Sequence, residues 1–174
     1  GTQVSFGLGM PFHLTRVQYD QIVAQARDEA PLECCGIVGG RDDQAQKVYA
    51  TRNADKSRVH YTIEPKDMLD ATRDIEDVHE WEISAFFHSH PASDAYPSPT
   101  DVREAVQSGY SEYSRFIIVS LLNPEKPVMR CFWLRGREMR IRRLRRLSRL
   151  LCRGKVITSS GHSDWMLPGG FWTG

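Results

Sequence analysis

The sequence lacks the features that mark several specialised classes of protein. It contains only four cysteines in 174 residues, too few and too scattered for a scaffold built on disulfides. No run of about 18 apolar residues occurs, so no segment is predicted to cross a membrane as a helix. There is also no internal repeat and no low-complexity tract. We therefore expect an ordinary globular protein with reduced thiols.

The composition supports this expectation. Hydrophobic residues make up 40% and charged residues 26% of the chain, which is typical of a folded domain. The length fits one domain with one core. No positively charged segment leading into an apolar one precedes Met10, so no secretory signal is predicted. Met10 is interpreted as the natural start, with residues 1–9 as a remnant or loose leader, and the cytoplasm is the expected compartment.

The net charge of +1 conceals an uneven distribution of charge. Residues 1–134 hold 13 Lys and Arg against 20 Asp and Glu, whereas residues 135–174 hold 10 against 2. An acidic surface does not attract phosphate backbones, so no nucleic-acid partner is expected for the first part. The sequence predicts an acidic body followed by a basic extension.

The basic extension has the spacing of an amphipathic helix. Isoleucine and leucine recur at three- and four-residue steps from Ile141 to Leu151, and arginine fills most positions between them. We predict a basic helix over Arg142–Cys152 that Gly154 ends, followed by a loose tail over Gly161–Gly174. Its leucines are interpreted as covering the sheet; binding of the helix to nucleic acid or to an anionic membrane surface is the alternative.

Helices and strands alternate in the acidic body without a strict βαβ order. Thr15, with Gln18 three residues later, has the pattern of a capping box. Pro65 and Pro99 each occupy the first position of a predicted helix, where the missing N–H costs nothing. The pattern predicts a mixed α/β fold in which helices pack on a sheet. The helices are expected over Thr15–Glu29, from Pro65 and from Pro99, and the strands over Cys35–Gly39, Lys47–Arg52, Ile83–His88, Arg115–Leu121 and Val128–Leu134.

Two histidines at the end of a predicted strand have the spacing of metal ligands. His88 and His90 are two residues apart, and on a strand this spacing points both side chains to the same face. Two imidazoles provide half of a tetrahedral zinc site. Asp101 is the natural third ligand, because it follows a loop long enough to turn the chain back. Three protein ligands leave one position open, which is typical of a catalytic zinc ion.

Two further residues are candidates for catalysis beside such an ion. Zinc lowers the pKa of a bound water from roughly 15.7 to about 7 and so provides a nucleophile near neutral pH. Glu33, just ahead of the strand that begins at Cys35, is predicted to take the proton and hand it to the leaving amine. The hydroxyl of Ser98 is a candidate donor to the developing oxyanion. Ser98 and Asp101 also have the spacing of a helix cap, and both roles are compatible.

Two separate segments resemble one known family. His88-Ser89-His90-Pro91, followed after six residues by Ser98 and after two more by Asp101, matches the H-[ST]-H-P-x6-S-x2-D signature of the JAMM metalloproteases, also called MPN-plus. Upstream, Pro31–Gly39 resembles the segment that holds the catalytic glutamate of that family. The resemblance covers about residues 12–141. It predicts a JAMM/MPN-plus catalytic domain over 10–141 and leaves the basic helix and tail, 142–174, outside it.

The resemblance implies both a fold and a mechanism. The fold is a curved mixed β-sheet flanked by helices, similar to that of cytidine deaminases. One Zn²⁺ ion would be bound by His88, His90 and Asp101. Glu33 would act as general acid and base through the zinc-bound water, and Ser98 would support the tetrahedral intermediate.

The resemblance also implies a class of substrate. Members of the family cleave amide or isopeptide bonds after the terminal Gly-Gly of ubiquitin-like proteins, and this chain is most similar to compact bacterial and archaeal members that process sulfur carriers. A ubiquitin-like or sulfur-carrier protein is therefore the expected partner, and the sequence leaves a homodimer open. A non-catalytic scaffold of the same fold is an alternative, which the retained ligands argue against. A thiol hydrolase that uses Cys34 or Cys35 is a second alternative. Cys35 lies on an apolar strand, where a thiol is typical of inert packing and not of catalysis.

Overall fold

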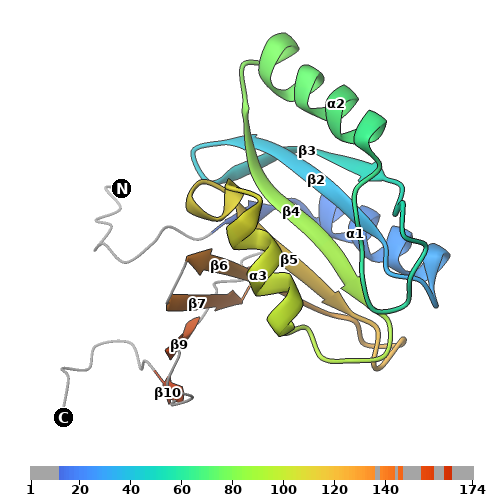
Figure 1. The fold of residues 1–174 in the computed structure, drawn as a ribbon, viewed down its shortest axis with the longest axis vertical. Coiled ribbons are helices and arrows are strands. Elements are labelled where there is room, and N and C mark those ends of the chain that lie inside the picture. Colours follow the sequence, from blue (N-terminus) through green and yellow to red (C-terminus); the bar gives the residue numbers. More distant parts are fainter. Residues whose placement is uncertain (1–11, 136–137, 144, 147–153, 159–162, 166–174) are drawn as a thin grey trace.

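A computed structural model describes residues 12–135, 138–143, 145–146, 154–158 and 163–165, in which one curved mixed sheet dominates (Figure 1). Its ten strands lie in the order β10-β9-β7-β6-β5-β4-β2-β3-β1-β8. The neighbours β4 and β5 are parallel, whereas β2 pairs antiparallel with both β3 and β4. Along the chain the elements are β1 (His13–Leu14), α1 (Arg16–Glu29), β2 (Cys35–Arg41), β3 (Gln44–Thr51), α2 (Pro65–Arg73), the π-helical turn η1 (Asp74–Val78), β4 (Glu82–His90), α3 (Pro99–Gln107), the 3₁₀ turn η2 (Tyr110–Glu112), β5 (Arg115–Ser120), β6 (Val128–Arg135), β7 (Glu138–Arg143), β8 (Arg145–Arg146), β9 (Gly154–Thr158) and β10 (Ser163–Trp165).

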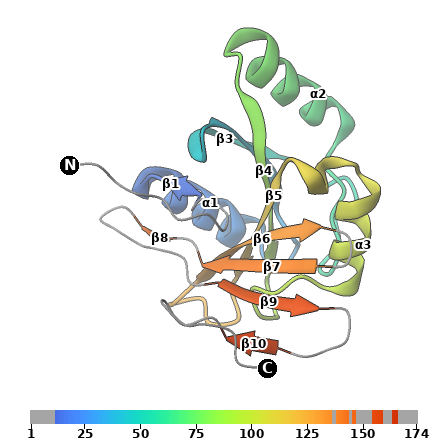
Figure 2. The same ribbon diagram turned by 90° about the vertical axis from the view of Figure 1, so that its left-hand side faces the viewer.

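Helices cover both faces of this sheet, which confirms the predicted mixed α/β fold. Figure 2 shows α1 and α3 on opposite sides of the central strands. Ile22 of α1 belongs to a buried cluster that also contains Phe87 of β4. Ala71 of α2 and Ala105 of α3 belong to a second cluster with Phe86. The central strands are therefore buried on both faces, as their nearly continuous apolar sequences require.

The alternation of side chains along β4 decides which face carries the predicted ligands. Because Phe86 faces α2 and α3 while Phe87 faces α1, His88 and His90 face the same side as Phe86. Ser89, between them, faces the α1 side. The spacing read from the sequence thus places both imidazoles under the helix that carries Asp101.

The predicted helix starts are confirmed. The hydroxyl of Thr15 accepts a hydrogen bond from the Gln18 N–H at 3.2 Å, and the Gln18 side chain accepts one from the Thr15 N–H at 2.8 Å. Pro65 and Pro99 are the first residues of α2 and α3. Within the described ranges, none of the helices is long and apolar enough to cross a membrane.

The first hairpin turns more tightly than the sequence predicts. The two strands were predicted to end at Gly39 and to resume at Lys47, but β2 continues to Arg41 and β3 begins at Gln44. Asp42 and Asp43 alone form the turn, and both have positive φ, 51° and 64°. Two-residue turns of this kind match the right-handed twist of the strands they join, and aspartate tolerates the left-handed conformation better than most residues do.

The prediction of a basic helix over Arg142–Cys152 is wrong wherever the structure describes that segment. Arg142 and Arg143 belong to β7, and Arg142 pairs with Cys131 of β6 on one side and with Gly154 of β9 on the other. Residues 145–146 form β8. Met139 and Ile141 already alternate with charged residues, and this period of two continues the sheet although the leucine spacing fits a helix.

The predicted loose tail also contains regular structure where it is described. Ser163–Trp165 form β10, which pairs antiparallel with β9. Residues 1–9, 144, 147–153 and 166–174 lie outside the described residues, and the predictions made for them stay untested. The boundary between the domain 10–141 and residues 142–174 likewise stays a prediction.

Ser89 fixes the strand of the predicted ligands to the segment of Glu33. Its Oγ accepts a hydrogen bond from the Cys34 N–H at 2.8 Å, and its own N–H donates to the Cys34 carbonyl at 3.1 Å. Ser89 is fully buried. Because a buried N–H without a partner is costly, the hydroxyl of Ser89 holds the start of β2 against the end of β4.

Removal of this hydroxyl should destabilise the protein. We expect Ser89→Ala to lower the free energy of unfolding by about 1 to 3 kcal/mol, because the buried Cys34 N–H loses its acceptor. Ser84→Ala is the matched control: Ser84 is buried on the same strand, and its Oγ has no hydrogen-bond partner among the described residues. Urea denaturation of both variants checks this; equal losses of stability would contradict it.

Candidate metal centre

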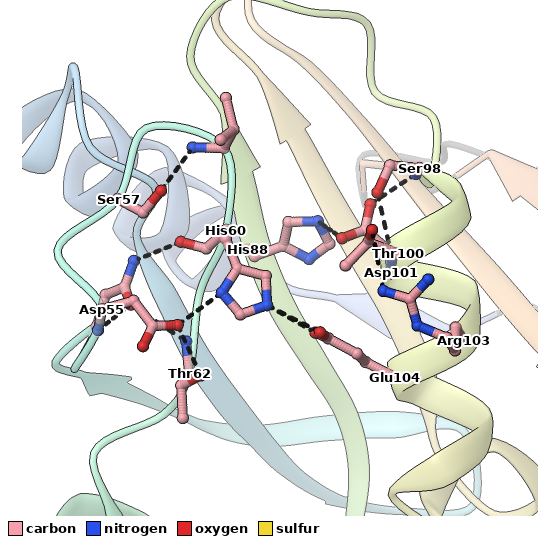
Figure 3. A network of polar contacts seen from close by, with 12 residues as sticks. Asp55, Ser57, His60, Thr62, His88, Ser98, Thr100, Asp101, Arg103 and Glu104 are labelled. Atoms are coloured by element: carbon pink, nitrogen blue, oxygen red, sulfur yellow. Dashed lines mark hydrogen bonds and ion pairs between the residues drawn. The ribbon is translucent and has the colours of Figure 1, made fainter.

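Three side chains from two elements converge at the end of β4. Nε2 of His88 lies 3.1 Å from Nε2 of His90. The carboxylate of Asp101, on α3, lies 3.6 Å from Nε2 of His88 and 3.4 Å from Nε2 of His90; Figure 3 shows how Asp101 faces His88. The three ligand atoms all lie within 4.8 Å of one another, close enough to share a metal ion.

The spacing of these atoms suits a small ion with short bonds. Zinc binds imidazole nitrogen and carboxylate oxygen at about 2.0 to 2.2 Å, so two ligand atoms at a tetrahedral angle are about 3.4 Å apart. The observed separations of 3.1, 3.4 and 3.6 Å lie around that value. Two imidazoles with one carboxylate are also a donor set of catalytic zinc sites. The residues present therefore fit a zinc ion.

The surroundings of His90 direct its Nε2 toward this point, whereas the His88 ring is held by packing. Nδ1 of His90 lies 2.8 Å from the backbone carbonyl of Asp94. Because a carbonyl can only accept, Nδ1 carries the proton and Nε2 of the neutral ring keeps its lone pair. His88 stacks on Tyr61, with 4.5 Å between the ring centroids. Burial lowers the pKa of His88, which favours the neutral form that binds metals.

The carboxylate of Asp101 is held by the start of its own helix. It accepts a hydrogen bond from the Ser98 N–H at 2.6 Å, and the Ser98 hydroxyl accepts one from the Asp101 N–H at 3.1 Å. Burial alone would raise the pKa of Asp101, but contacts with His88, His90 and the Ser98 N–H hold that pKa well below its usual range. Asp101 is thus an ionised carboxylate in a fixed orientation. Ser98 accepts at the cap and keeps its own hydroxyl hydrogen to donate.

Glu33 lies beside this group, two residues before the start of β2. Only 4% of its surface is exposed. Burial raises the pKa of Glu33 to about 7, and the charges of His90, Asp101 and His60 also act on it. Its Oε2 is buried, and no described residue gives that atom a hydrogen bond. A carboxyl group that titrates near neutral pH is suited to accept a proton and return it.

The backbone of Glu33 is held from both sides. Its N–H donates to the carbonyl of Ser57 at 2.8 Å, and its carbonyl accepts from the side-chain amide of Asn53 at 3.0 Å. Both partners belong to the segment after β3. The position of the carboxyl group therefore depends on residues about 20 positions further along the chain.

The structure brings the sequence-predicted residues together. His88, His90 and Asp101 form the group, Ser98 caps the helix of Asp101, and Glu33 lies within electrostatic reach. Their roles in metal binding and catalysis stay predictions. The residues that orient them were not predicted, because their partners lie 4 to 44 positions away and no local pattern reveals them. These residues are Asn53, His60, Tyr61, Asp94 and Glu104.

The chain matches the model of a known protein family. The family model described as "Prokaryotic homologs of the JAB domain" matches residues 15–135, which contain every residue of the site. The chain belongs to this family. The resemblance read from the two sequence motifs is confirmed, and the JAB match ends close to the end of β6.

Known proteins from several organisms are similar to this JAB domain. The CysO-cysteine peptidase of Mycobacterium tuberculosis is 31% identical over 113 residues, which cover 64% of this chain and 74% of that protein. The desampylase of Haloferax volcanii is 35% identical over 99 residues, 52% of this chain and 70% of that protein. A solution structure of a protein from Desulfitobacterium hafniense is 30% identical, covers 87% of both chains and has a TM-score of 0.59.

The two adjacent thiols of this JAB domain are unsuited to nucleophilic catalysis. Cys34 and Cys35 are fully buried. Burial raises the pKa of each thiol to about 12. A reactive cysteine needs the opposite shift, because the thiolate is the nucleophile. The thiol-hydrolase alternative therefore finds no support in the structure.

Zinc binding should depend on the carboxylate of Asp101. We expect the wild type to bind one zinc ion and Asp101→Asn to bind it at least about 100-fold more weakly, since even indirect partners of metal ligands contribute 10- to 100-fold. The side-chain oxygen of asparagine can still accept the Ser98 N–H, and Ser98 still caps α3, so the helix start should persist. Competition with a chelator measures the affinity, with elemental analysis of the bound metal.

The control for this experiment is Asp94→Asn. The side chain of Asp94 is exposed, and it is the backbone carbonyl that contacts His90. Asp94→Asn should therefore bind zinc as the wild type does. Equal affinity in Asp101→Asn and Asp94→Asn would remove Asp101 from the site.

The raised pKa of Glu33 should make the metal-free protein less stable at high pH. The carboxyl group stays protonated in the folded state up to about pH 7, whereas in the unfolded state it ionises near 4.5. Its contribution to stability is thus complete below pH 4.5 and is lost as the pH rises through 7. We expect Glu33→Gln to gain about 2 to 3 kcal/mol relative to the wild type between pH 5 and pH 8. Denaturation with a chelator present measures this; a pH-independent difference would contradict it.

Proposed function

We propose that this JAB domain is a zinc-dependent hydrolase that cleaves an amide bond after the diglycine C-terminus of a ubiquitin-like or sulfur-carrier protein. The observation that carries the proposal is the convergence of His88, His90 and Asp101, with buried Glu33 beside them. A bound zinc ion would polarise the scissile carbonyl and lower the pKa of water to about 7. The cytoplasm is the compartment that fits such a substrate.

Glu33 is the group proposed to move the proton. In hydrolysis the C–N bond breaks, the carbonyl carbon gains the OH of water, and the nitrogen gains the remaining hydrogen. A carboxyl group with a pKa of about 7 can take that proton from the attacking water as a base and deliver it to the leaving nitrogen as an acid. Its buried Oε2, which no described residue engages, is the atom suited to both steps.

Ser98 is proposed to stabilise the charge that develops on the carbonyl oxygen. Its Oγ accepts from the Asp101 N–H, which fixes the hydroxyl at the rim of the site. The remaining hydroxyl hydrogen can be donated to the oxyanion. One such donor is typically worth a factor of about 100 to 1,000 in kcat.

The relatives support the substrate class. Two of them are named for the removal of cysteine from CysO and for desampylation. A diglycine tail has no side chains, so an extended strand can approach a buried site that a bulkier tail could not reach. We therefore propose a small carrier protein of ubiquitin-like fold as the substrate, with cysteine or a lysine side chain as the leaving amine.

The alternative is a non-catalytic scaffold of the same fold. Such a protein needs no metal and gains nothing from a buried, partner-free carboxyl oxygen, because burying polar groups without hydrogen bonds is costly. The ion-sized group of ligand atoms and the state of Glu33 favour the enzyme.

A direct assay tests the proposal. The zinc-loaded protein is incubated with a sulfur-carrier protein that bears cysteine in amide linkage on its terminal glycine, and mass spectrometry follows the release. We expect multiple turnovers for the wild type and a kcat at least about 100-fold lower for Glu33→Gln, since general acid–base catalysis contributes 10² to 10⁴. A second substrate, a carrier joined to lysine by an isopeptide bond, distinguishes the two leaving amines.

The control variant is Glu125→Gln, which removes a carboxylate from the exposed turn after β5. It should retain wild-type kcat and KM. Absence of turnover above the Glu33→Gln level with both substrates, in protein shown to contain zinc, would leave the scaffold as the better explanation.

A further inference from the structure

The segment that joins β3 to α2 is fastened to α3 by one histidine. We call residues 53–63 the 53–63 loop. Nε2 of His60 lies 2.9 Å and 3.0 Å from the two carboxylate oxygens of Glu104, and Nδ1 lies 2.6 Å from the carboxylate of Asp55. Figure 3 shows His60 between these two acids, next to His88.

The geometry of this bridge fixes the charge of the imidazole. Both ring nitrogens face carboxylate groups, whose oxygens accept hydrogen bonds from ring N–H groups. A neutral imidazole has one N–H, so two such contacts require the protonated ring. The hydroxyl of Thr62 also donates to Asp55, at 2.7 Å, which keeps that carboxylate oriented. His60 is therefore a cation held between two anions, one on its own loop and one on α3.

The 53–63 loop holds the groups that orient the site. The carbonyl of Ser57 accepts the Glu33 N–H, and the amide of Asn53 donates both to the Glu33 carbonyl and to the His60 carbonyl at 3.0 Å. Tyr61, adjacent to His60, stacks on the ring of His88. A displacement of this loop would therefore move the backbone of Glu33 and uncover one face of a predicted ligand.

Glu104, at the other end of the bridge, lies on α3, the helix that also carries the predicted ligand Asp101. Glu104 follows Asp101 by three residues on α3, and this spacing places both side chains on one side of the helix. The contact between His60 and Glu104 joins residues 44 positions apart in sequence. It connects the loop that holds the proposed base to the element that holds the proposed ligand.

We propose that His60, through Glu104, is a positioning residue that fixes Glu33 relative to the metal ligands. This inference rests on the proposed function for its effect on catalysis. Its structural part, that the bridge orders the 53–63 loop and with it the backbone of Glu33, stands on the contacts alone. The hydrogen-bond partners of the His60 ring are Asp55 and Glu104 and not the predicted ligands, so we place its effect on kcat through Glu33.

The structural part is tested by hydrogen exchange. In Glu104→Ala the bridge loses its anchor on α3, and the amide of Glu33, bonded to Ser57 of the loop, should exchange about tenfold faster than in the wild type. The amides of Ile117 and Ile118 in β5 should be unchanged, because they lie in the buried sheet. Gln107→Ala, an exposed change one turn further on the same helix, is the matched control and should alter neither. Glutamate 104 is partly exposed, so its loss should not unfold the domain.

The catalytic part is tested by steady-state kinetics with the zinc-loaded protein. We expect Glu104→Ala and His60→Ala each to lower kcat about tenfold with KM changed less than twofold and with zinc content unchanged. The double variant should lose no more than either single variant, because both remove one bridge. Glu104→Gln, which keeps an acceptor of the same size, should recover part of the lost kcat.

The exchange and kinetic measurements can each overturn the proposed role of His60. Unchanged exchange at Glu33 in Glu104→Ala, or exchange that rises equally in β5, would overturn the proposal, as would additive losses of kcat in the double variant. If the wild type itself releases no product, the proposed function fails while the exchange measurement still decides whether the bridge orders the loop. A selective rise at Glu33 without loss of kcat in an active enzyme would overturn the positioning role.

Discussion

A central strand of this protein ends in two buried imidazoles, and the segments around it provide partners for three of their four ring nitrogens, Nδ1 of His88 excepted. Polar groups inside a protein must be hydrogen-bonded or bound to an ion, because their removal from water is otherwise uncompensated. β4 lies between β2 and β5, so water has little access to His88 and His90. The carbonyl of Asp94 takes the outer nitrogen of His90, and the inner nitrogens of both rings share the carboxylate of Asp101.

This requirement explains why a loop rich in proline and serine has a defined path. The segment between His90 and α3 must return to present first the carbonyl of Asp94 and then the carboxylate of Asp101. Neighbouring strands support it: the hydroxyl of Ser120 donates to the Ser93 carbonyl at 2.6 Å, and the Leu121 N–H donates to the His90 carbonyl at 3.1 Å. The loop is thus anchored on the end of β5 and is not an independent surface feature.

The sequence was informative wherever a short pattern has one physical meaning. The i, i+2 spacing of His88 and His90, and the caps at Thr15 and Ser98, each follow from local backbone geometry, and the structure places them as expected. The segment after Arg135 was misread because its residues satisfy two periods at once. Pairing of Arg142 with Cys131 and Gly154 selects the strand, and pairing is a tertiary property that spacing does not contain.

In the candidate site, too, some features follow from local sequence and others only from the folded structure. Ligand-like residues could be selected from residue type and spacing, but the groups that orient them could not. Asn53 and His60 act through partners far along the chain, and the stacking of Tyr61 on His88 arises only when the loop folds over β4. Sequence reasoning therefore finds the chemical groups, whereas their protonation and orientation come from the folded environment.

The reciprocal cap between Ser98 and Asp101 has a consequence for how an ion could enter and leave. One carboxylate oxygen of Asp101 accepts the N–H of Ser98 at the cap of α3, so this carboxylate does not rotate freely. We therefore expect a metal ion to bind to a site that is already ordered, without folding of the polypeptide around it. Exchange of one divalent ion for another should leave the surrounding helix and strands where they are, which separates the supply of metal from the integrity of the fold.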